Sequence, residues 1–198
     1  MQEKNTIYIF IDASNVWNAV KSVKKFIEYP ILKTYFKEKF NSDKVEVFYY
    51  DAYPKAGTRD YDLDGKHRFY TYLKKGLGFT VRKKELKRIS VIEGNTESII
   101  EKGNMDVELT IDALHNINKY NIAILFSGDA DFLALLNYLK NRGKKVFIFS
   151  TEGNISHELK TGGNGYFDLK GINELWGKDL KHRGDSWKQN HPQLRGWP

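Results

Sequence analysis

Short apolar runs rich in β-branched and aromatic residues recur along the chain and alternate with segments of helical periodicity. The first run, 6–11, is β-branched and aromatic rather than polar at every second position, and 122–127 and 145–150 are mostly apolar, which is typical of parallel strands buried on both faces. The alternation predicts a three-layer α/β sandwich on a mostly parallel sheet. The expected strands are 6–11, 45–50, 79–83, 122–127 and 145–150, and the expected helices are 16–40 with a break at Pro30, 64–75, 104–118 and 131–142.

Carboxylates follow two of these strands directly. Asp12 ends the first strand, Asp129 and Asp131 follow the fourth, and Asp106 opens the helix that precedes the fourth. The carboxyl ends of neighbouring parallel strands meet at one edge of a sheet, where open α/β sheets bind ligands. Carboxylates gathered there repel one another unless a cation lies between them. Because these positions offer only oxygen ligands, the sequence predicts Mg²⁺ or Mn²⁺ rather than Zn²⁺.

Each acid also has a structural interpretation. Asp131 is a candidate helix N-cap, Asp129 a candidate partner for the turn that follows it, and Asp106 a first-turn acid that complements the helix dipole. Asp12 is harder to explain structurally, because it follows an apolar strand. Asp112 is the weakest metal-ligand candidate, since six residues of helix turn it about 240° away from Asp106.

The positive charge is concentrated in one segment. The chain carries a net charge of +7, from 32 Lys and Arg against 25 Asp and Glu. Nine basic residues and one acid give 66–88 a net +8, so the remainder sums to −1. Aromatic residues interleave with these cations, a mixture that favours phosphate binding and base stacking; the alternative is a helix that buries its rings and solvates its lysines. The basic residues are Lys66, Arg68, Lys74, Lys75, Arg82, Lys83, Lys84, Lys87 and Arg88, and the aromatic ones Phe69, Tyr70, Tyr72 and Phe79.

Composition excludes several classes of protein. The 198 residues include no cysteine, which rules out disulfides, thiolate metal sites and cysteine nucleophiles and makes the cytoplasm the default location. Apolar runs such as 122–126 are far shorter than the ~20 residues of a membrane span, and the N-terminus does not resemble a secretory signal. The glycine-rich 162–165 lacks a dinucleotide-binding or P-loop pattern. We expect one domain over 1–177 and a polar tail over 178–198.

Three segments in this order, 10–16, 102–114 and 127–132, together with the Gly-Lys-Lys-Val of 143–146, resemble the NYN domain family, in particular the LabA-like group of PIN-like nucleases. The resemblance implies a PIN-like Rossmannoid three-layer α/β/α sandwich on a mostly parallel sheet of five to six strands. It also implies an Mg²⁺- or Mn²⁺-dependent ribonuclease. Carried over residue by residue, it places the metal-binding aspartates at Asp12, Asp106, Asp129 and Asp131, a polar partner at Asn15 and a small hydroxyl at Ser127.

The leading hypothesis is therefore a nuclease that hydrolyses phosphodiester bonds with a metal-activated water. Asn15 and Ser127 would orient ligands or the water, and 66–88 would bind the backbone. The expected partner is nucleic acid, RNA in preference to DNA; no membrane is expected, and a homodimer is left open. Two alternatives remain at this point: an RNA-binding regulatory protein of the same fold with little or no cleavage activity, and a phosphohydrolase acting on small phosphates.

Overall fold

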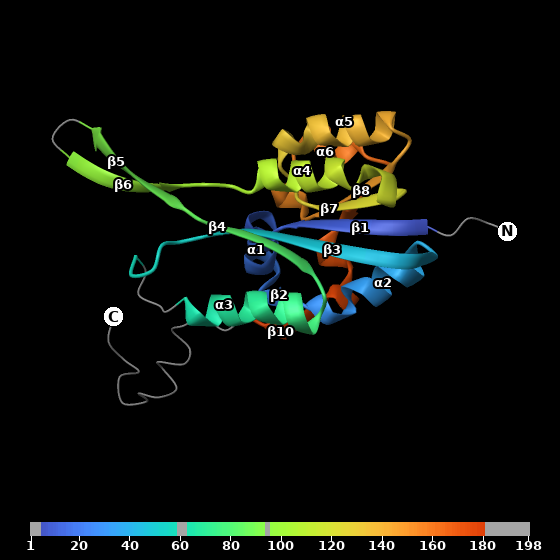
Figure 1. Ribbon diagram of the computed structural model, residues 1–198, viewed down its shortest axis with the longest axis horizontal. Helices are drawn as coiled ribbons and strands as arrows, with labels where there is room; N and C mark the ends of the chain where they lie inside the picture. Colours follow the sequence, from blue (N-terminus) through green and yellow to red (C-terminus); the bar gives the residue numbers. More distant parts are fainter. Residues whose placement is uncertain (1–4, 59–62, 94–95, 181–198) are drawn as a thin grey trace.

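Six parallel strands form the central sheet (Figure 1). The computed structural model describes residues 5–58, 63–93 and 96–180. Every neighbouring pair in the sheet is parallel, which confirms the predicted mostly parallel α/β architecture. In spatial order the strands are β4 (Thr80–Glu85), β3 (Ser42–Tyr53), β1 (Asn5–Asp12), β7 (Ile122–Phe126), β8 (Lys145–Ser150) and β9 (Gly165–Asp168).

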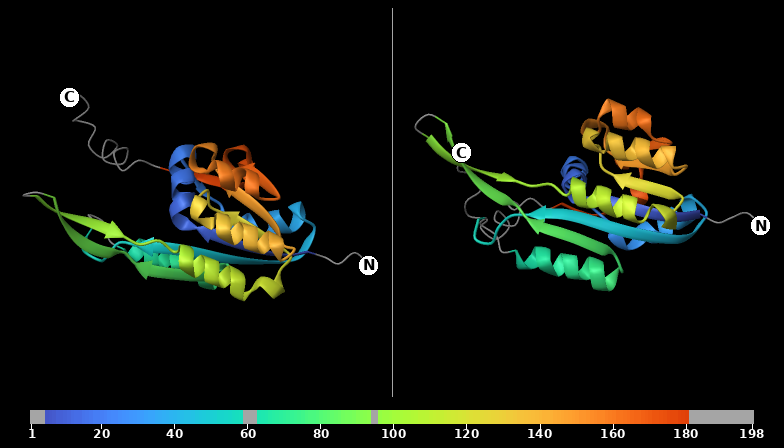
Figure 2. Two further views of the ribbon diagram at one scale, coloured as in Figure 1. Left: turned by 90° about the horizontal axis from the view of Figure 1, so that it is seen from above. Right: turned by 45° about the horizontal axis from the view of Figure 1, so that its top comes forward.

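Helices cover both faces of the sheet, as Figures 1 and 2 show. One face carries α1 (Ala13–Val23), α2 (Leu32–Lys39) and α3 (Asp64–Thr71), and the other carries α4 (Asp106–His115), α5 (Leu133–Asn141) and α6 (His157–Gly162). Single turns connect several elements: η1 (Tyr29–Ile31), the π-helical η2 (Tyr72–Gly76), η3 (Ile117–Lys119), η4 (Ala130–Phe132), η5 (Glu152–Asn154), η6 (Leu169–Gly171) and η7 (Asn173–Leu175). In the described part of the chain, no helix is long and apolar enough to cross a membrane.

The strand β1 contributes to both hydrophobic cores. Successive side chains of a strand point to opposite faces, so Ile7, Ile9 and Ile11 pack under α1–α3, whereas Tyr8 and Phe10 pack under α4–α6. All five are at most 5% exposed. A strand covered on both faces has no polar side to alternate, which explains why this run is apolar throughout.

The chain reverses its direction of sheet growth at β1. From β1 it adds β3 and β4 on one side, and it then crosses over to add β7, β8 and β9 on the other. In open α/β sheets the crevice beyond such a switch point is where ligands bind. The carboxyl ends of β1 and β7, which carry the predicted acids, flank this point.

Two sequence predictions about element bounds are wrong. The expected helix over 16–40 is divided, because Lys24 ends α1 in the left-handed conformation (φ 60°). The chain then forms β2 (Lys25–Ile27), which pairs with β10 (Trp176–Asp179) in a separate antiparallel ribbon. Lys178 and Asp179, assigned to the tail, thus lie in β10, while 181–198 fall outside the described residues.

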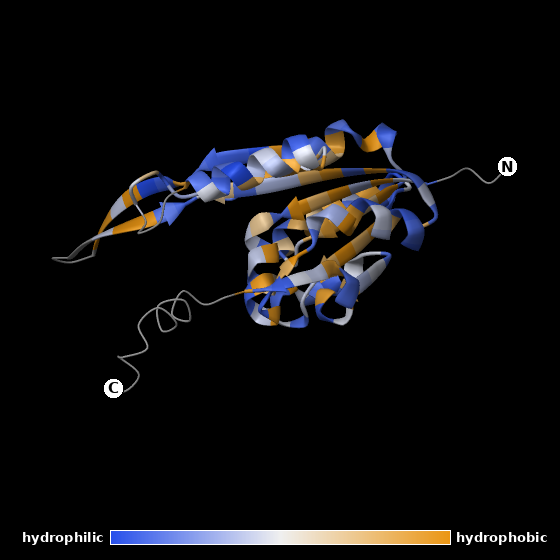
Figure 3. Cartoon of the chain, turned by 90° about the horizontal axis from the view of Figure 1, so that it is seen from below, coloured by the Kyte–Doolittle hydropathy of each residue, from blue (hydrophilic) through white to orange (hydrophobic). Residues whose placement is uncertain are grey.

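An antiparallel arm between β4 and α4 was not predicted. It consists of β5 (Lys87–Glu93) and β6 (Thr96–Lys102) and projects away from the sheet (Figure 1). Seen from below, hydrophobic residues line the strands of the sheet and recur on this arm (Figure 3). Ile92, for example, is 74% exposed. The arm therefore contributes nothing to either core.

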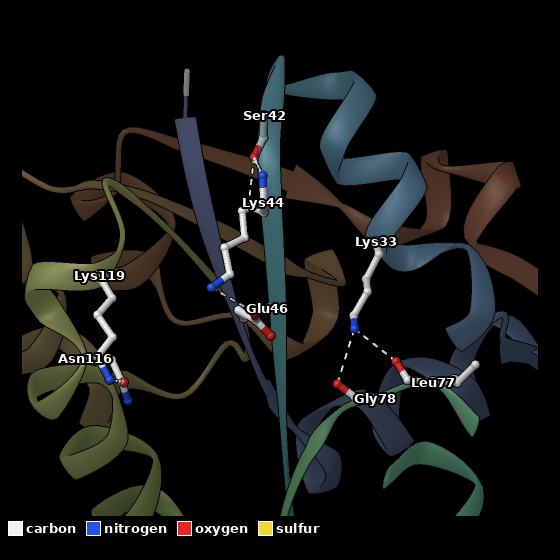
Figure 4. A network of polar contacts seen from close by, with 8 residues as sticks. All are labelled: Lys33, Ser42, Lys44, Glu46, Leu77, Gly78, Asn116 and Lys119. Carbon is white, nitrogen blue, oxygen red and sulfur yellow. Dashed lines mark hydrogen bonds and ion pairs between the residues drawn. The ribbon is translucent and has the colours of Figure 1, made fainter. Parts of the chain in front are cut away.

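The loop before β4 is held by a lysine from the neighbouring helix. Lys33 of α2 donates hydrogen bonds to the carbonyl oxygens of Leu77 (3.0 Å) and Gly78 (3.2 Å), as Figure 4 shows. Gly78 has a φ of 63°, a conformation that L side chains rarely adopt. The turn at 77–78 is therefore fixed, and it sets the start of β4.

Gly128, between β7 and η4, cannot accept a side chain. A Cβ there would lie 1.8 Å from the carbonyl oxygen of Asn154, and main-chain atoms cannot move aside as a flexible side chain can. We expect Gly128→Ala to lower the free energy of unfolding by about 1–3 kcal/mol, the usual cost of overpacking. Urea denaturation measures it. Gly153→Ala is the matched control, because nothing lies within 4 Å of a Cβ at Gly153; an equal loss in both variants would contradict the steric explanation.

Candidate metal centre

The first acid, Asp12, ends β1 and caps α1. Its Oδ1 accepts hydrogen bonds from the amides of Ser14 (3.0 Å) and Asn15 (3.3 Å) and from the Ser14 hydroxyl (2.7 Å). These bonds satisfy amides that a helix N-terminus otherwise leaves unpaired. The structural role that the sequence did not suggest for Asp12 is therefore a helix cap, which fixes the carboxylate at the end of the strand.

Ser127 connects the ends of β1 and β7. Its side chain is completely buried, and its hydroxyl donates to Asp12 Oδ2 at 3.0 Å while accepting from the amide of Asp129 at 3.3 Å. Asp129 in turn caps η4 by accepting from the amide of Asp131 at 3.0 Å. A continuous set of hydrogen bonds thus runs from Asp12 to Asp131 across the switch point.

Three acids gather on the α4 side of this connection. Asp106, Asp129 and Asp131 each place a carboxylate oxygen within 4.8 Å of those of the other two. Asp106 is half-buried and the other two are exposed. Asp12 is not one of the three but lies beside them. We call these four residues the acidic rim.

The charges of the acidic rim act on Asp106. Partial burial, together with the negative charges of Asp12, Asp129 and Asp131, raises the pKa of Asp106 to about 6, although a hydrogen bond from Asn104 opposes the rise. A bound cation would oppose this rise, because a nearby opposite charge favours the ionised carboxylate. All the donors are hard oxygens, so the set fits Mg²⁺ or Mn²⁺.

Asn15 points to the η5 loop. Its Oδ1 accepts from the Ser150 hydroxyl (3.2 Å) and from Asn154 Nδ2 (2.8 Å), and Asn154 Nδ2 also lies 3.2 Å from the Asn15 carbonyl oxygen. These contacts hold the first turn of α1 against the loop that follows β8. A role of Asn15 toward a ligand or a water stays a prediction.

Ion pairs with two cations of β4 hold α4, and therefore Asp106, in place. Asp112 is 8% exposed and accepts two hydrogen bonds from the guanidinium of Arg82 (3.0 and 3.1 Å) and one from the Tyr50 hydroxyl (3.0 Å). Lys84 reaches the first turn of α4 and binds Glu108 at 2.8 Å. This arrangement agrees with the prediction that Asp112 is the weakest metal-ligand candidate, because its carboxylate is bonded to Arg82 and Tyr50 inside the fold.

The basic segment divides into two groups. Lys66, Arg82 and Lys84 form ion pairs with Asp51, Asp112 and Glu108, and Lys83 lies over the rings of Tyr53 and Tyr70. Among the described residues no ion pair involves the remaining members, which are Arg68, Lys74, Lys75, Lys87 and Arg88. Part of the segment therefore stabilises the fold, and the phosphate-binding role stays a prediction.

The aromatic residues of this segment belong mainly to the core. Tyr70 and Phe79 are each 4% exposed, and Phe69 packs against the same cluster. Tyr72 is the exception, at 46% exposed. Because buried rings cannot stack on a base, the interpretation that these rings bind bases is wrong for Tyr70 and Phe79.

One acid at this edge of the sheet escaped the sequence analysis. Asp51 follows the apolar run 45–50 just as Asp12 follows 6–11, so the same signal was present. It is 9% exposed, and its Oδ2 accepts from Lys66 Nζ (3.1 Å) and the Tyr70 hydroxyl (2.8 Å). Burial raises its pKa, which the Lys66 charge partly offsets.

The chain is similar to several known proteins. The model of the NYN domain matches residues 6–170. Low amplitude and bright protein LabA of Synechococcus elongatus is 29% identical over 168 residues, 83% of each chain. An uncharacterized protein of Methanocaldococcus jannaschii is 36% identical over 73 residues, 36% of this chain and 30% of its own length. A crystal structure of a protein of unknown function from Vibrio parahaemolyticus shares the fold, with a TM-score of 0.62 at 23% identity over 85% of this chain and 95% of that one.

The raised pKa of Asp106 predicts a pH-dependent stability. The folded protein holds this proton up to a pH of about 6, whereas an unfolded chain releases it near about 3.9. Raising the pH through this interval therefore destabilises the wild type but not Asp106→Asn. We expect the melting temperature of Asp106→Asn, minus that of the wild type, to increase between about pH 4 and about pH 7 in EDTA.

Glu108→Gln provides a control of opposite sign on the same helix. Although partial burial acts in the other direction, hydrogen bonds from Lys84 and its own amide lower the pKa of Glu108. The wild-type carboxylate thus stabilises the fold above its unfolded pKa, and this gain is lost as the pH falls. Glu108→Gln should be less stable than the wild type near pH 7, with the difference shrinking in acid. The same trend in both variants would refute the assignment.

Proposed function

Since the chain belongs to the NYN domain family of PIN-like nucleases, as its motifs predicted, we propose that it is a divalent-metal-dependent ribonuclease acting at the acidic rim. One observation carries the proposal: three carboxylates lie within 4.8 Å of one another beside the switch point of the sheet. Capping and dipole interactions explain each acid singly. They do not explain why like charges converge at the position where this architecture binds ligands.

Each member of the rim has a distinct task in this proposal. Asp106, Asp129 and Asp131 hold the cation, Mg²⁺ or Mn²⁺, while Asp12 adds negative charge and, through Ser127, fixes the turn that presents Asp129. In such sites the ion supplies Lewis-acid polarisation of the phosphodiester and activation of an attacking water. Asn15 supports the rim indirectly by holding the first turn of α1 against the η5 loop.

Cations near the rim would bind the RNA backbone. Lys87 opens β5 opposite Lys102 of β6, and Leu86 packs against Gly103, three residues before Asp106. The base of the arm is thus continuous with the start of α4. Lys87 and Arg88 form no ion pair with the described residues, in contrast to Arg82 and Lys84, so they are the better candidates for phosphate contacts.

The cleavage assay tests the acidic rim. Purified protein should cut RNA with Mg²⁺ or Mn²⁺, lose activity in EDTA and regain it when the metal is restored. We expect Asp129→Asn to lower kcat/KM by more than the ~10–100-fold that outer-shell changes cost in metal sites. Glu38→Gln is the control, because this exposed carboxylate on α2 precedes β3 and so lies at the opposite end of the sheet. RNA binding without metal-dependent cleavage would support the regulatory alternative instead.

Salt dependence tests the arm cations. A single strand gives a slope of log K against log salt of about −0.7 per neutralised phosphate, so Lys87→Gln with Arg88→Gln should reduce the slope by about 1.4. Binding titrations at four or more salt concentrations measure this. Lys37→Gln on α2 should leave the slope unchanged. An unchanged slope in the arm variant would remove both residues from the backbone contact.

A further inference from the structure

An aromatic pocket lies beside the acidic rim on the opposite face of the sheet from α4. Its volume is about 610 Å³, within the range of small-molecule and cofactor sites. Residues of α1, β2, η1, β3 and α3 line it, and its rings are those of Trp17, Phe26, Tyr29, Tyr49 and Phe69. The proposed chemistry at the rim does not use it.

Two rings of this pocket are unusually exposed. Trp17 is 45% exposed and Phe26 44%, and their centroids lie 6.4 Å apart at an interplanar angle of 35°. Behind them, Tyr29 and Phe69 pack with centroids 5.5 Å apart. Large rings left half in water at the mouth of a pocket indicate a binding surface. Rings on several sides favour a flat, aromatic occupant.

The pocket also contains a polar pair that an aliphatic ligand would not need. Lys66 Nζ and Asp51 Oδ2, 3.1 Å apart, both belong to the pocket lining. Within the described residues, both hydrogen bonds of the Asp51 carboxylate fall on Oδ2, which leaves Oδ1 as an acceptor. The pair therefore offers one donor and one acceptor side by side, the complement of a nucleobase edge.

The pocket is directly connected to the rim. Ser14 belongs to its lining and donates its hydroxyl proton to Asp12 Oδ1 at 2.7 Å, and the other oxygen of Asp12 binds Ser127. One side chain thus separates the pocket from the first acid. A nucleotide with its phosphate at the rim would have its base within reach of the rings.

We infer that this pocket binds one unpaired nucleobase of the RNA strand next to the phosphate held at the acidic rim. The inference rests on the proposed function and deepens it: a base held against Trp17 and Phe26 cannot be paired, so the RNA strand is unpaired at this nucleotide. Stacking on aromatic side chains is the common means of binding such bases, and it tolerates any base identity.

The test compares RNA affinities in an Asp129→Asn background, so that the RNA stays intact. A single-stranded RNA 12-mer is titrated by fluorescence anisotropy against the background protein, its Trp17→Ala/Phe26→Ala derivative and a Trp17→Phe/Phe26→Tyr derivative. Stacking contributions correspond to between about fivefold and about 150-fold per base. We expect the alanine pair to bind at least about fivefold more weakly and the aromatic pair to retain affinity. Tyr138→Ala, a 43% exposed ring on α5, is the matched control.

Abasic substitution locates the base. A single abasic nucleotide is moved along the 12-mer, and the background protein should lose affinity at one position only. In the Trp17→Ala/Phe26→Ala derivative, the abasic nucleotide at that position should cause no further loss of affinity. This non-additivity is the coupling that a double-mutant cycle measures. Equal losses at every position, or equal affinity for the duplex form, would overturn the inference.

The outcomes separate this inference from the proposed function. Metal-dependent cleavage with unchanged affinity in the alanine pair overturns the inference and leaves the ribonuclease intact, assigning the pocket to a ligand other than RNA. A position-specific abasic effect without any cleavage by the wild type supports the pocket and overturns the ribonuclease. Absence of both RNA binding and RNA cleavage by the wild type overturns both.

Discussion

The parallel pairing of β1 with β3 and β7 determines where Asp12 and the turn that carries Asp129 and Asp131 lie. Asp12 stands opposite Tyr50 at the end of the β1–β3 ladder, and Ile11 stands opposite Phe126 at the end of β7. A shift of one residue would turn every side chain of β1 to the other face. Since both faces of β1 are buried, that shift would disrupt two cores at once. Strand pairing in the sheet, rather than the conformation of the loops, therefore fixes where the ends of β1 and β7 lie.

Holding like charges at fixed positions costs free energy, and hydrogen bonds within the fold offset most of this cost. Asp12 accepts four hydrogen bonds, and Asp129 accepts one from the turn that it caps. Asp106 is the member whose pKa rises, because its partial burial and the negative charges of the other three outweigh its hydrogen bond from Asn104. A carboxylate whose pKa is shifted by burial and by like charges does not stabilise the fold. Such residues concentrate at functional sites.

The sequence predicted the layers, the parallel sheet and the family, because apolar runs and their terminal carboxylates are local signals. Contacts between distant segments were beyond it. The pairing of Arg82 with Asp112 joins residues 30 positions apart, so the charge at 82 could not be distinguished from a phosphate-binding one. The aromatic pocket needs α1, β2 and α3 together, and neither Trp17 nor Phe26 has a local signature. The arm was a missed signal rather than a hidden one, since Gly94-Asn95 between two β-branched runs is typical of a hairpin.

The arm allows the chain to vary in length without a change in the geometry of the sheet edge. Its two strands leave and rejoin the body side by side, with Lys87 opposite Lys102, so the ends that connect to β4 and α4 stay together however far the ladder extends. Inserting or deleting residues as cross-strand pairs would lengthen or shorten the arm while the connections at its base kept their spacing. Among chains of this architecture, insertion and deletion should therefore accumulate between β4 and α4, while the spacing from Asp12 to Asn15 and from Ser127 to Asp131 stays constant.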